Sequence, residues 1–264
     1  MEIICCQPDI VWENPEANHA HVRDLLNHAT SPISPDSLIA LPEMFACGFS
    51  VQNPYAVAES PSGASFQFLQ ELAIKYQSYL VAGIPLSNSP NETPTNEAIV
   101  VAPDGSLVAR YSKIHPFSPA GENEHFASGN TPVTAKCGSW LVSPAICYDL
   151  RFPELFRHNT SGKGAELLVV IANWPAVRAE HWTTLLRARA IENQAYVAGV
   201  NRCGQDPHHQ YAGQSIIVDP TGQVLAEADD QPGLTRAHLN HEIISQWRRD
   251  FPALADTKLV ALPR

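Results

Sequence analysis

The feature that most constrains the fold is the alternation of short apolar segments with amphipathic ones along the chain. Short apolar runs bounded by turn residues are typical of buried strands, and apolar side chains spaced three and four apart are typical of helices. Such alternation predicts an α/β domain in which helices cover sheets. The predicted strands cover residues 1–7, 37–41, 79–84, 98–101, 140–146, 167–172 and 195–200, and the predicted helices cover 16–29, 66–76 and 179–194.

One internal similarity refines this architecture. The segment AIVVAPDGSLVA at 98–109 matches SIIVDPTGQVLA at 215–226, with Pro103 and Gly105 in the places of Pro220 and Gly222. Each segment reads as two alternating strands around a turn whose glycine supplies a positive φ. Two such hairpins at equivalent places predict a pseudo-symmetric sandwich of two sheets, although Pro-x-Gly hairpins are also simply common.

Composition and charge exclude several classes of protein. Hydrophobic residues make up 44% of the 264 residues and charged residues 17%, as in globular domains. The formal net charge is -10, and no local cluster of Lys and Arg reverses it, so we expect no nucleic-acid partner. The start Met1 to Pro8 lacks the features of a signal peptide, and no segment has the apolar length of a membrane span. We therefore expect a cytoplasmic protein with no membrane partner.

The cysteines and histidines do not form a metal-binding pattern. In a reducing compartment the six cysteines are expected to be thiols, and adjacent Cys5 and Cys6 should point to opposite faces of a strand. The pair His208-His209 has no Cys or His neighbour at ligand spacing. We expect no metal site.

Three polar residues follow predicted strands and suggest nucleophilic chemistry. Glu43 follows the run 37–42, Lys113 follows the second strand of the first hairpin, and Cys147 ends the run 140–146. Ligands bind at the carboxyl ends of strands in α/β sheets. There a thiolate can attack, a carboxylate can take its proton, and an ammonium can stabilise an oxyanion. Taken singly, a buried Cys is more often an inert small hydrophobe, and a Glu or Lys after a strand is usually a solvated loop end.

The surrounding motifs resemble those of the nitrilase superfamily, the carbon–nitrogen hydrolases. The motifs are LPEMF at 41–45, YSKIH at 111–115 and AICYDLRFPE at 145–154. The resemblance implies a four-layer α-β-β-α sandwich with pseudo-two-fold internal symmetry. It also implies a triad of Glu43 as general base, Lys113 as oxyanion stabiliser and Cys147 as nucleophile, with the backbone N–H of Tyr148 completing the oxyanion hole.

A fourth segment, GENEHFASGN at 121–130, is similar to the family stretch that carries a supporting glutamate. Glu122 matches that position best and Glu124 is the second choice, and a carboxylate there would hold Lys113 in place and keep it charged. The alternative is that Glu122 is a solvated loop acid. The implied chemistry needs neither a metal nor an organic cofactor.

The second half of the chain resembles the omega-amidase branch. The residues that carry the resemblance are CYDLRFP at 147–153, IANWPAVR at 171–178 and HWTTLLRARAIENQAYV at 181–197. The resemblance implies hydrolysis of the ω-amide of a dicarboxylic acid monoamide, such as 2-oxoglutaramate, to acid and ammonia. The alternatives are a sibling amidase acting on deaminated glutathione or an N-carbamoyl amine, a nitrilase proper, and a non-catalytic scaffold.

The substrate pocket is predicted from residues near the triad in sequence. Asn173 and Trp174 lie beyond a strand end, and Phe45 and Phe49 flank the Glu43 motif. Core packing is the alternative for Trp174. A substrate carboxylate needs a cation or several donors. The candidates are Arg151, Arg178, Arg187 and Arg189, the last two of which could instead pair with Glu180 and Glu192 on a helix surface.

The chain reads as one domain over residues 1–264, because no linker rich in Gly, Ser or Pro divides it. The family resemblance implies a homodimer. The apolar residues of Ile243 to Trp247 and of Phe251-Pro252 suggest that the C-terminal segment, about 241–264, contributes to the interface.

Overall fold

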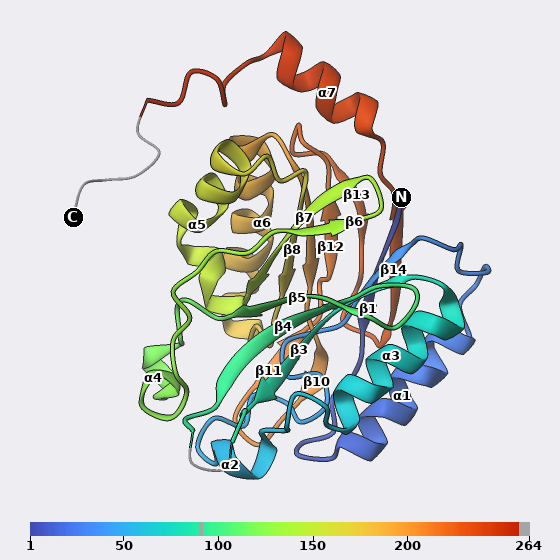
Figure 1. Ribbon diagram of the computed structural model, residues 1–264, viewed down its shortest axis with the longest axis vertical. Coiled ribbons are helices and arrows are strands. Elements are labelled where there is room, and N and C mark those ends of the chain that lie inside the picture. The colour runs from blue at the N-terminus through green and yellow to red at the C-terminus, as the bar shows by residue number, and fades with distance from the viewer. Residues whose placement is uncertain (90–91, 259–264) are drawn as a thin grey trace.

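The computed structural model describes residues 1–89 and 92–258 and contains two six-stranded sheets packed between layers of helices (Figure 1). The strands of the first sheet are, in spatial order, β14 (Gly233–His238), β1 (Glu2–Gln7), β2 (Leu38–Ala40), β3 (Tyr79–Leu86), β4 (Thr95–Val101) and β5 (Leu107–Ser112). Those of the second are β13 (Val224–Glu227), β12 (Ile216–Val218), β9 (Tyr196–Val200), β8 (Leu167–Ile171), β7 (Trp140–Ile146) and β6 (Ala135–Cys137). A separate hairpin pairs β10 (Cys203–Gln205) with β11 (Gln210–Ala212).

Helices cover the outer face of each sheet (Figure 1). The first sheet is covered by α1 (Pro15–Asn27) and α3 (Ala64–Tyr76), and the second by α5 (Pro153–Arg157) and α6 (Ala179–Asn193). The shorter helices α2 (Pro54–Val57) and α4 (Glu122–His125) lie in loops, and α7 (His241–Asp250) follows β14. This arrangement confirms the predicted four-layer α-β-β-α sandwich.

Alternation along β1 shows how the layers are held together. Ile3 and Cys5 are buried in the core between the two sheets, whereas Ile4 and Cys6 are buried in the core beneath α1 and α3. Successive side chains of a strand point to opposite faces, so one short apolar run supplies both cores. The prediction that Cys5 and Cys6 face opposite ways is confirmed.

The predicted pseudo-two-fold symmetry is present in both topology and register. In each sheet three parallel strands, β1-β2-β3 or β7-β8-β9, are extended by an antiparallel hairpin, β4-β5 or β12-β13. Both hairpins shift register at the same point, after Val100 in one and after Ile217 in the other. Both turns close on a glycine of positive φ, Gly105 at 82° and Gly222 at 91°.

The topology brings the ends of β2, β5 and β7 to one region. Strands β2 and β3 are parallel, and two antiparallel pairings then return β5 to the direction of β3. The carboxyl ends of β2 and β5 therefore lie at one edge of the first sheet. The carboxyl end of β7 meets them from the second sheet, which is the layout that the sequence predicted for the three polar residues.

The predicted C-terminal segment is only partly described. Its first part forms α7, which lies beyond the sheets at the top of Figure 1, and residues 259–264 are outside the described residues. In the described part of the chain, no helix has both the length and the apolar character needed to cross a membrane.

Candidate active site

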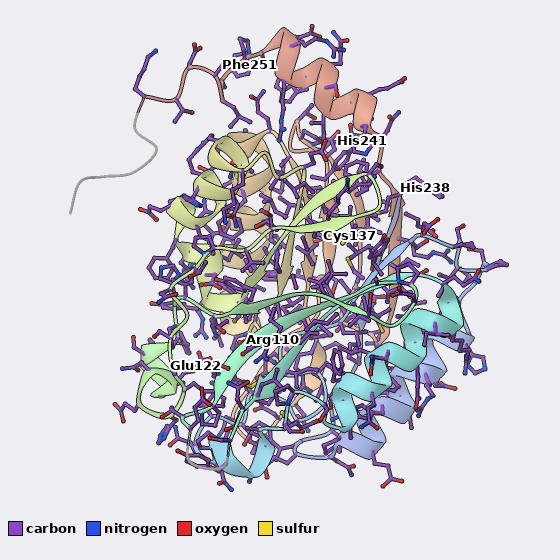
Figure 2. All side chains as sticks on the ribbon, viewed as in Figure 1. Arg110, Glu122, Cys137, His238, His241 and Phe251 are labelled. Carbon is purple, nitrogen blue, oxygen red and sulfur yellow. The ribbon has the colours of Figure 1, made fainter. Side chains whose placement is uncertain are left out.

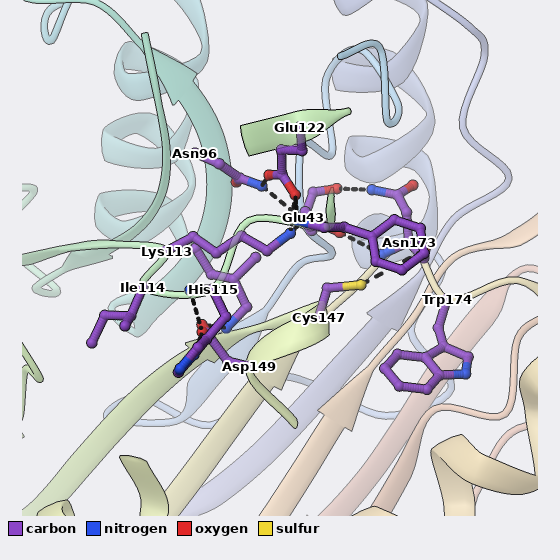
Figure 3. Close-up of polar contacts among 12 residues, drawn as sticks. Glu43, Asn96, Lys113, Ile114, His115, Glu122, Cys147, Asp149, Asn173 and Trp174 are labelled. Atoms are coloured by element: carbon purple, nitrogen blue, oxygen red, sulfur yellow. Dashed lines mark hydrogen bonds and ion pairs between the residues drawn. The ribbon is translucent and has the colours of Figure 1, made fainter. Parts of the chain in front are cut away.

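Glu43 lies just past the end of β2, in a buried turn where Met44 has a φ of 45°. Its carboxylate is held by three donors (Figure 3). Lys113 Nζ donates to Oε1 at 2.8 Å, Asn96 Nδ2 donates to the same oxygen at 2.7 Å, and the backbone N–H of Asn173 donates to Oε2 at 3.0 Å. Oε1 is thus saturated, while Oε2 keeps capacity to accept a further proton donor.

Lys113 follows β5 and is bound between two carboxylates. Its Nζ lies 2.8 Å from Glu43 Oε1 and 2.8 Å from Glu122 Oε2, and all three side chains are buried. Burial alone would lower the pKa of Lys113, but Glu122 and Glu43 raise it above its ordinary value. The lysine is therefore charged in this buried site.

Glu122 is the glutamate that the structure brings to Lys113. It is fully buried at the start of α4, whereas Glu124 is exposed. Glu122 also accepts from the backbone N–H of Phe117 at 2.6 Å and from Asn96 Nδ2 at 2.9 Å. The solvated-acid alternative for Glu122 is wrong.

Cys147 directly follows β7 and has a strained backbone conformation. Its φ is 47°, in the left-handed region that residues other than glycine rarely adopt, and it opens a 3₁₀ turn over Cys147–Arg151. The thiol donates to the backbone carbonyl of Asn173, with Sγ and O 3.9 Å apart. Burial raises the pKa of Cys147 well above its ordinary value, and Glu43 raises it further while Lys113 opposes the shift. At rest the sulfur is a neutral thiol.

Tyr148 directly follows the thiol in the same 3₁₀ turn, and it also lines the pocket. The role of its backbone N–H as an oxyanion donor stays a prediction.

The thiol opens into a pocket with mainly aromatic walls. The walls include Phe49, Phe117, Tyr148, Trp174 and Tyr211. Two cations also line the pocket: Arg151, whose guanidinium carbon lies 4.9 Å from the Trp174 ring centroid, and Arg178, which lies 5.5 Å from that of Phe117.

The predicted pocket residues have different outcomes. Phe49, Asn173 and Trp174 line the pocket. Trp174 is nevertheless 3% exposed and donates through Nε1 to the Arg178 carbonyl at 2.7 Å, so it is both packed and part of the wall. The interpretation of Phe45 as a pocket residue is wrong, because its ring is buried under α3, 6.0 Å from the Phe68 ring.

The structure separates the four candidate arginines. Arg151 and Arg178 line the pocket, and Arg187 and Arg189 do not. Arg189 pairs with Glu192 at 2.8 Å as the alternative proposed, but it is buried and also donates to the Leu150 carbonyl at 2.7 Å. The prediction that it lies on the helix surface is wrong. Arg187 donates to the Gly222 carbonyl at 3.4 Å rather than to a glutamate.

Two residues of the site had no role in the sequence prediction. Asn96 bridges Glu43 and Glu122 with one amide nitrogen, and Asp149 accepts hydrogen bonds from both sides of the site. The sequence signal for Asn96 is a polar residue in the apolar strand TNEAIVV, and Asp149 belongs to the cysteine motif.

Among the described residues, no three His, Cys, Asp or Glu side chains are grouped so that they could hold a metal ion.

Comparison with known proteins identifies the family. The family model described as carbon-nitrogen hydrolase matches residues 3–249. The chain belongs to the carbon–nitrogen hydrolase family. It is 38% identical to an omega-amidase of Yersinia enterocolitica, over 97% of this chain and 96% of that protein. It is 31% identical to a 2-oxoglutaramate amidase of Bacillus subtilis, over 97% of each chain.

A solved structure agrees with this family membership. A CN-hydrolase superfamily protein of Xanthomonas campestris, which has an arsenic adduct in its active site, matches 100% of this chain and 99% of its own. The TM-score is 0.91 and the sequence identity 31%. The nitrilase-type sandwich predicted from the motifs is confirmed for nearly the whole chain.

Proposed function

We propose that the chain is an omega-amidase that hydrolyses the ω-amide of a dicarboxylic acid monoamide of the 2-oxoglutaramate type to the acid and ammonia. The observation that carries the proposal is the pocket itself: the Cys147 thiol lies beside the Glu43–Lys113–Glu122 cluster, and Arg151 and Arg178 line the same cavity. The names of the relatives from Yersinia enterocolitica and Bacillus subtilis support the same substrate class.

The first half of the reaction is acyl transfer to sulfur. Because Cys147 rests as a thiol, attack on the amide carbon requires simultaneous loss of its proton, and Glu43 Oε2 is the acceptor. The Lys113 ammonium and the Tyr148 N–H stabilise the oxyanion, where one such donor is worth about 100- to 1000-fold in rate. The C–N bond then breaks, Glu43 returns the proton to the nitrogen, and ammonia leaves a thioester on Cys147.

The second half is hydrolysis of that thioester. Glu43 takes a proton from water as the water oxygen attacks the acyl carbon, and the same donors hold the second oxyanion. The C–S bond breaks, the sulfur recovers the proton from Glu43, and the carboxylic acid leaves. Glu122 touches no reacting atom in this scheme and acts by holding Lys113 between two negative charges.

Arg151 and Arg178 supply the recognition of the remote carboxylate in this proposal. Charge-assisted hydrogen bonds from guanidinium groups bind planar carboxylates well, and both groups are held over aromatic rings of the pocket wall. The amide then lies toward Cys147 and the carboxylate toward the arginines, which orients the ω-amide for attack.

The decisive experiment measures ammonia release from 2-oxoglutaramate, glutamine and deaminated glutathione by wild type and by Cys147→Ala. Release from 2-oxoglutaramate that disappears in the variant is expected. Preferential release from another amide, still dependent on Cys147, would reject the substrate class and keep the nucleophile. Activity that persists in Cys147→Ala would reject the mechanism.

The role of the arginines has its own test. Arg151→Met and Arg178→Met should each raise KM for an anionic ω-amide by about 10-fold, the effect of roughly 1.4 kcal/mol of lost binding, and leave KM for uncharged butanamide nearly unchanged. Arg187→Met, on α6 and outside the pocket, is the matched control. Equal losses for both substrates would show that the arginines do not read the carboxylate.

We also propose that the chain is a single domain that acts in the cytoplasm as a homodimer. The six cysteines are all free and buried, as expected of a protein in a reducing compartment. Ile243 on α7 and Phe251 just after it are 43% and 56% exposed, and such apolar residues favour association.

A further inference from the structure

Asp149 is a buried carboxylate outside the catalytic cluster whose hydrogen bonds are fully used. It lies two residues after the thiol, in the 3₁₀ turn over Cys147–Arg151, and is 0% exposed. Oδ2 accepts from the Tyr111 hydroxyl at 2.7 Å and from the Ile146 N–H at 3.0 Å. Oδ1 accepts from the backbone N–H of His115 at 3.1 Å and from its Nδ1 at 2.8 Å (Figure 3).

These donors come from the two sheets. Ile146 is the last residue of β7 in the second sheet, whereas Tyr111 and His115 flank Lys113 at the end of β5 in the first. One carboxylate therefore joins the segment that carries the lysine to the turn that carries the cysteine. Among the hydrogen bonds of the described residues, none links the Lys113 and Cys147 side chains directly, so their alignment depends on such indirect ties.

The cysteine turn needs a restraint of this kind. A non-glycine residue at a φ of 47° costs about 1 to 3 kcal/mol and persists only when its surroundings hold it. Asp149 closes the turn over Cys147, because its side chain bonds the N–H of the residue just before the thiol. The same side chain fixes the tautomer of His115: a carboxylate only accepts, so Nδ1 carries the hydrogen.

His115 extends the network toward the pocket wall. Its ring stacks on Phe152 with centroids 3.8 Å apart and planes 8° apart. Phe152 meets the Tyr148 ring edge-on at 5.3 Å, and Tyr148 lines the pocket. A shift of His115 would therefore displace both the lysine segment and the residue whose N–H faces the oxyanion.

We infer that Asp149 is a positioning residue that holds the strained Cys147 turn in register with Lys113, with Tyr111 and His115 as the donors that tie it to the lysine segment. Asp149 is absent from the pocket lining and touches no reacting atom, so it acts through Cys147 and Lys113. This inference rests on the proposed function only because the kcat measurements below use the amidase reaction.

The test compares Asp149→Asn and Tyr111→Phe with wild type. An amide in place of the carboxylate turns one oxygen into a donor that faces two other donors. The phenylalanine keeps the ring but removes two hydrogen bonds, the one donated to Asp149 and the one accepted from the Ile114 N–H at 3.3 Å. A misplacement of about 1 Å costs about 100-fold in rate, so kcat should fall about 100-fold in Asp149→Asn and about 10-fold in Tyr111→Phe. KM should change less than about 3-fold, because neither Asp149 nor Tyr111 lines the pocket.

A second measurement does not depend on the substrate. Alkylation of Cys147 by iodoacetamide, followed by mass spectrometry of the intact protein, should slow in both variants in parallel with kcat. If wild type releases no ammonia from any amide tried, the proposed function fails, while the alkylation rates still decide the role of Asp149.

Two controls separate positioning from general stability. Thr160→Val removes a buried hydroxyl that donates to the Phe156 carbonyl and to Asn193 Oδ1 and does not line the pocket. This variant should lower the unfolding midpoint without changing kcat or the alkylation rate. His115→Asn keeps a nitrogen donor in the place of Nδ1 and should retain most of the activity, whereas His115→Leu should lose about 10-fold.

The inference is overturned if Asp149→Asn and Tyr111→Phe behave like Thr160→Val, with lower midpoints but wild-type kcat and alkylation rates. If Asp149→Asn does not fold, Tyr111→Phe and the His115 pair decide the question by the same two rates.

Discussion

The segment from α3 to β5 and the segment from α6 to β13 correspond residue by residue at an offset of 117. Both helices end on a glutamine in the left-handed region, Gln77 at a φ of 48° and Gln194 at 46°. In each segment the turn glycine packs over an isoleucine of the preceding helix, Gly105 over Ile74 and Gly222 over Ile191. The backbone plan is thus repeated down to its caps and turns.

The polar side chains of the candidate active site are not repeated. At the same offset Lys113 corresponds to Asp230, which is exposed, and Asn96 corresponds to Gly213, which has no side chain. The repeated features satisfy backbone conformation and apolar burial, which both halves need. The residues that differ lie at the strand ends, where the first sheet meets the cysteine of the second, so the active site uses the symmetric scaffold asymmetrically.

The largest expected difference between equivalent positions is at Lys113. Lys113→Met leaves the buried Glu43 and Glu122 carboxylates without their shared cation. The free energy of unfolding should fall by about 3–5 kcal/mol, as when one partner of a buried pair is removed, and kcat should fall about 1000-fold with the loss of an oxyanion donor. Chemical denaturation and ammonia release measure the two effects.

Asp230→Asn is the control at the equivalent position in the other half. The residue is exposed, and among the described residues its carboxylate accepts only from Gln231 Nε2. Stability and kcat should stay within about 0.5 kcal/mol and twofold of wild type. A loss comparable to that of Lys113→Met would show that the two halves share the catalytic task after all.

Asn96 should give the next largest effect. Asn96→Ala removes the N–H donors from Glu43 Oε1 and Glu122 Oε1 and leaves both carboxylates less restrained. The expected fall in kcat is about 10- to 100-fold, with a loss of stability of about 1–3 kcal/mol. Asn193→Ala, which loses buried hydrogen bonds to Thr160 and Arg189 away from the pocket, should cost similar stability and no activity.

Asn96 also illustrates what sequence alone can provide. Apolar runs, hairpin turns and the motifs around Glu43, Lys113 and Cys147 are local patterns, and they predicted the sandwich and the triad. The contacts of Asn96 join residues 53 and 26 positions away in the chain, and no local pattern encodes them. They arise because β2 and β4 flank β3 in one sheet and the loop that carries α4 lies beside them, an arrangement that only the folded chain specifies.

The positions of the four candidate arginines could not be predicted for the same reason, because they too depend on contacts made only in the folded chain. All four lie near the motifs in sequence, but whether a side chain reaches the pocket depends on the helix face it occupies and on its partners. Arg189 is drawn inward to the Leu150 carbonyl, while Arg178 lies in the turn before α6 and faces the pocket. Pattern alone predicted the opposite environment for Arg189.

Helix α7 has no counterpart at the equivalent point of the first repeat. Substitutions on α7 therefore test whether only the second half of the chain contributes to the proposed dimer interface. Figure 2 labels His241 and Phe251 at the end of the molecule away from Glu122. Ile243→Ser with Phe251→Ser should convert the proposed dimer to a monomer, because the substitutions remove exposed apolar area. Light scattering gives the mass. Ile74→Ser, an exposed isoleucine of α3, is the matched control, and a dimer that survives the α7 substitutions would place the interface elsewhere.

The smallest effects are expected at the two turn glycines, where the repeats are most alike. Gly105→Ala and Gly222→Ala force alanine to a φ of 82° or 91° and should each cost about 1–2 kcal/mol of stability without changing kcat. The cost should be larger at Gly222, because an added Cβ would lie 2.6 Å from Ile191 atoms but 3.0 Å from the nearest atom of Ile74. Ile74→Val combined with Gly105→Ala, and Ile191→Val combined with Gly222→Ala, should reduce the difference in stability cost between the two glycine variants. If the two glycine variants also differ in kcat, the Gly105 hairpin transmits strain along β5 to Lys113. The two hairpins would then be equivalent in backbone conformation but not in their effect on the reaction.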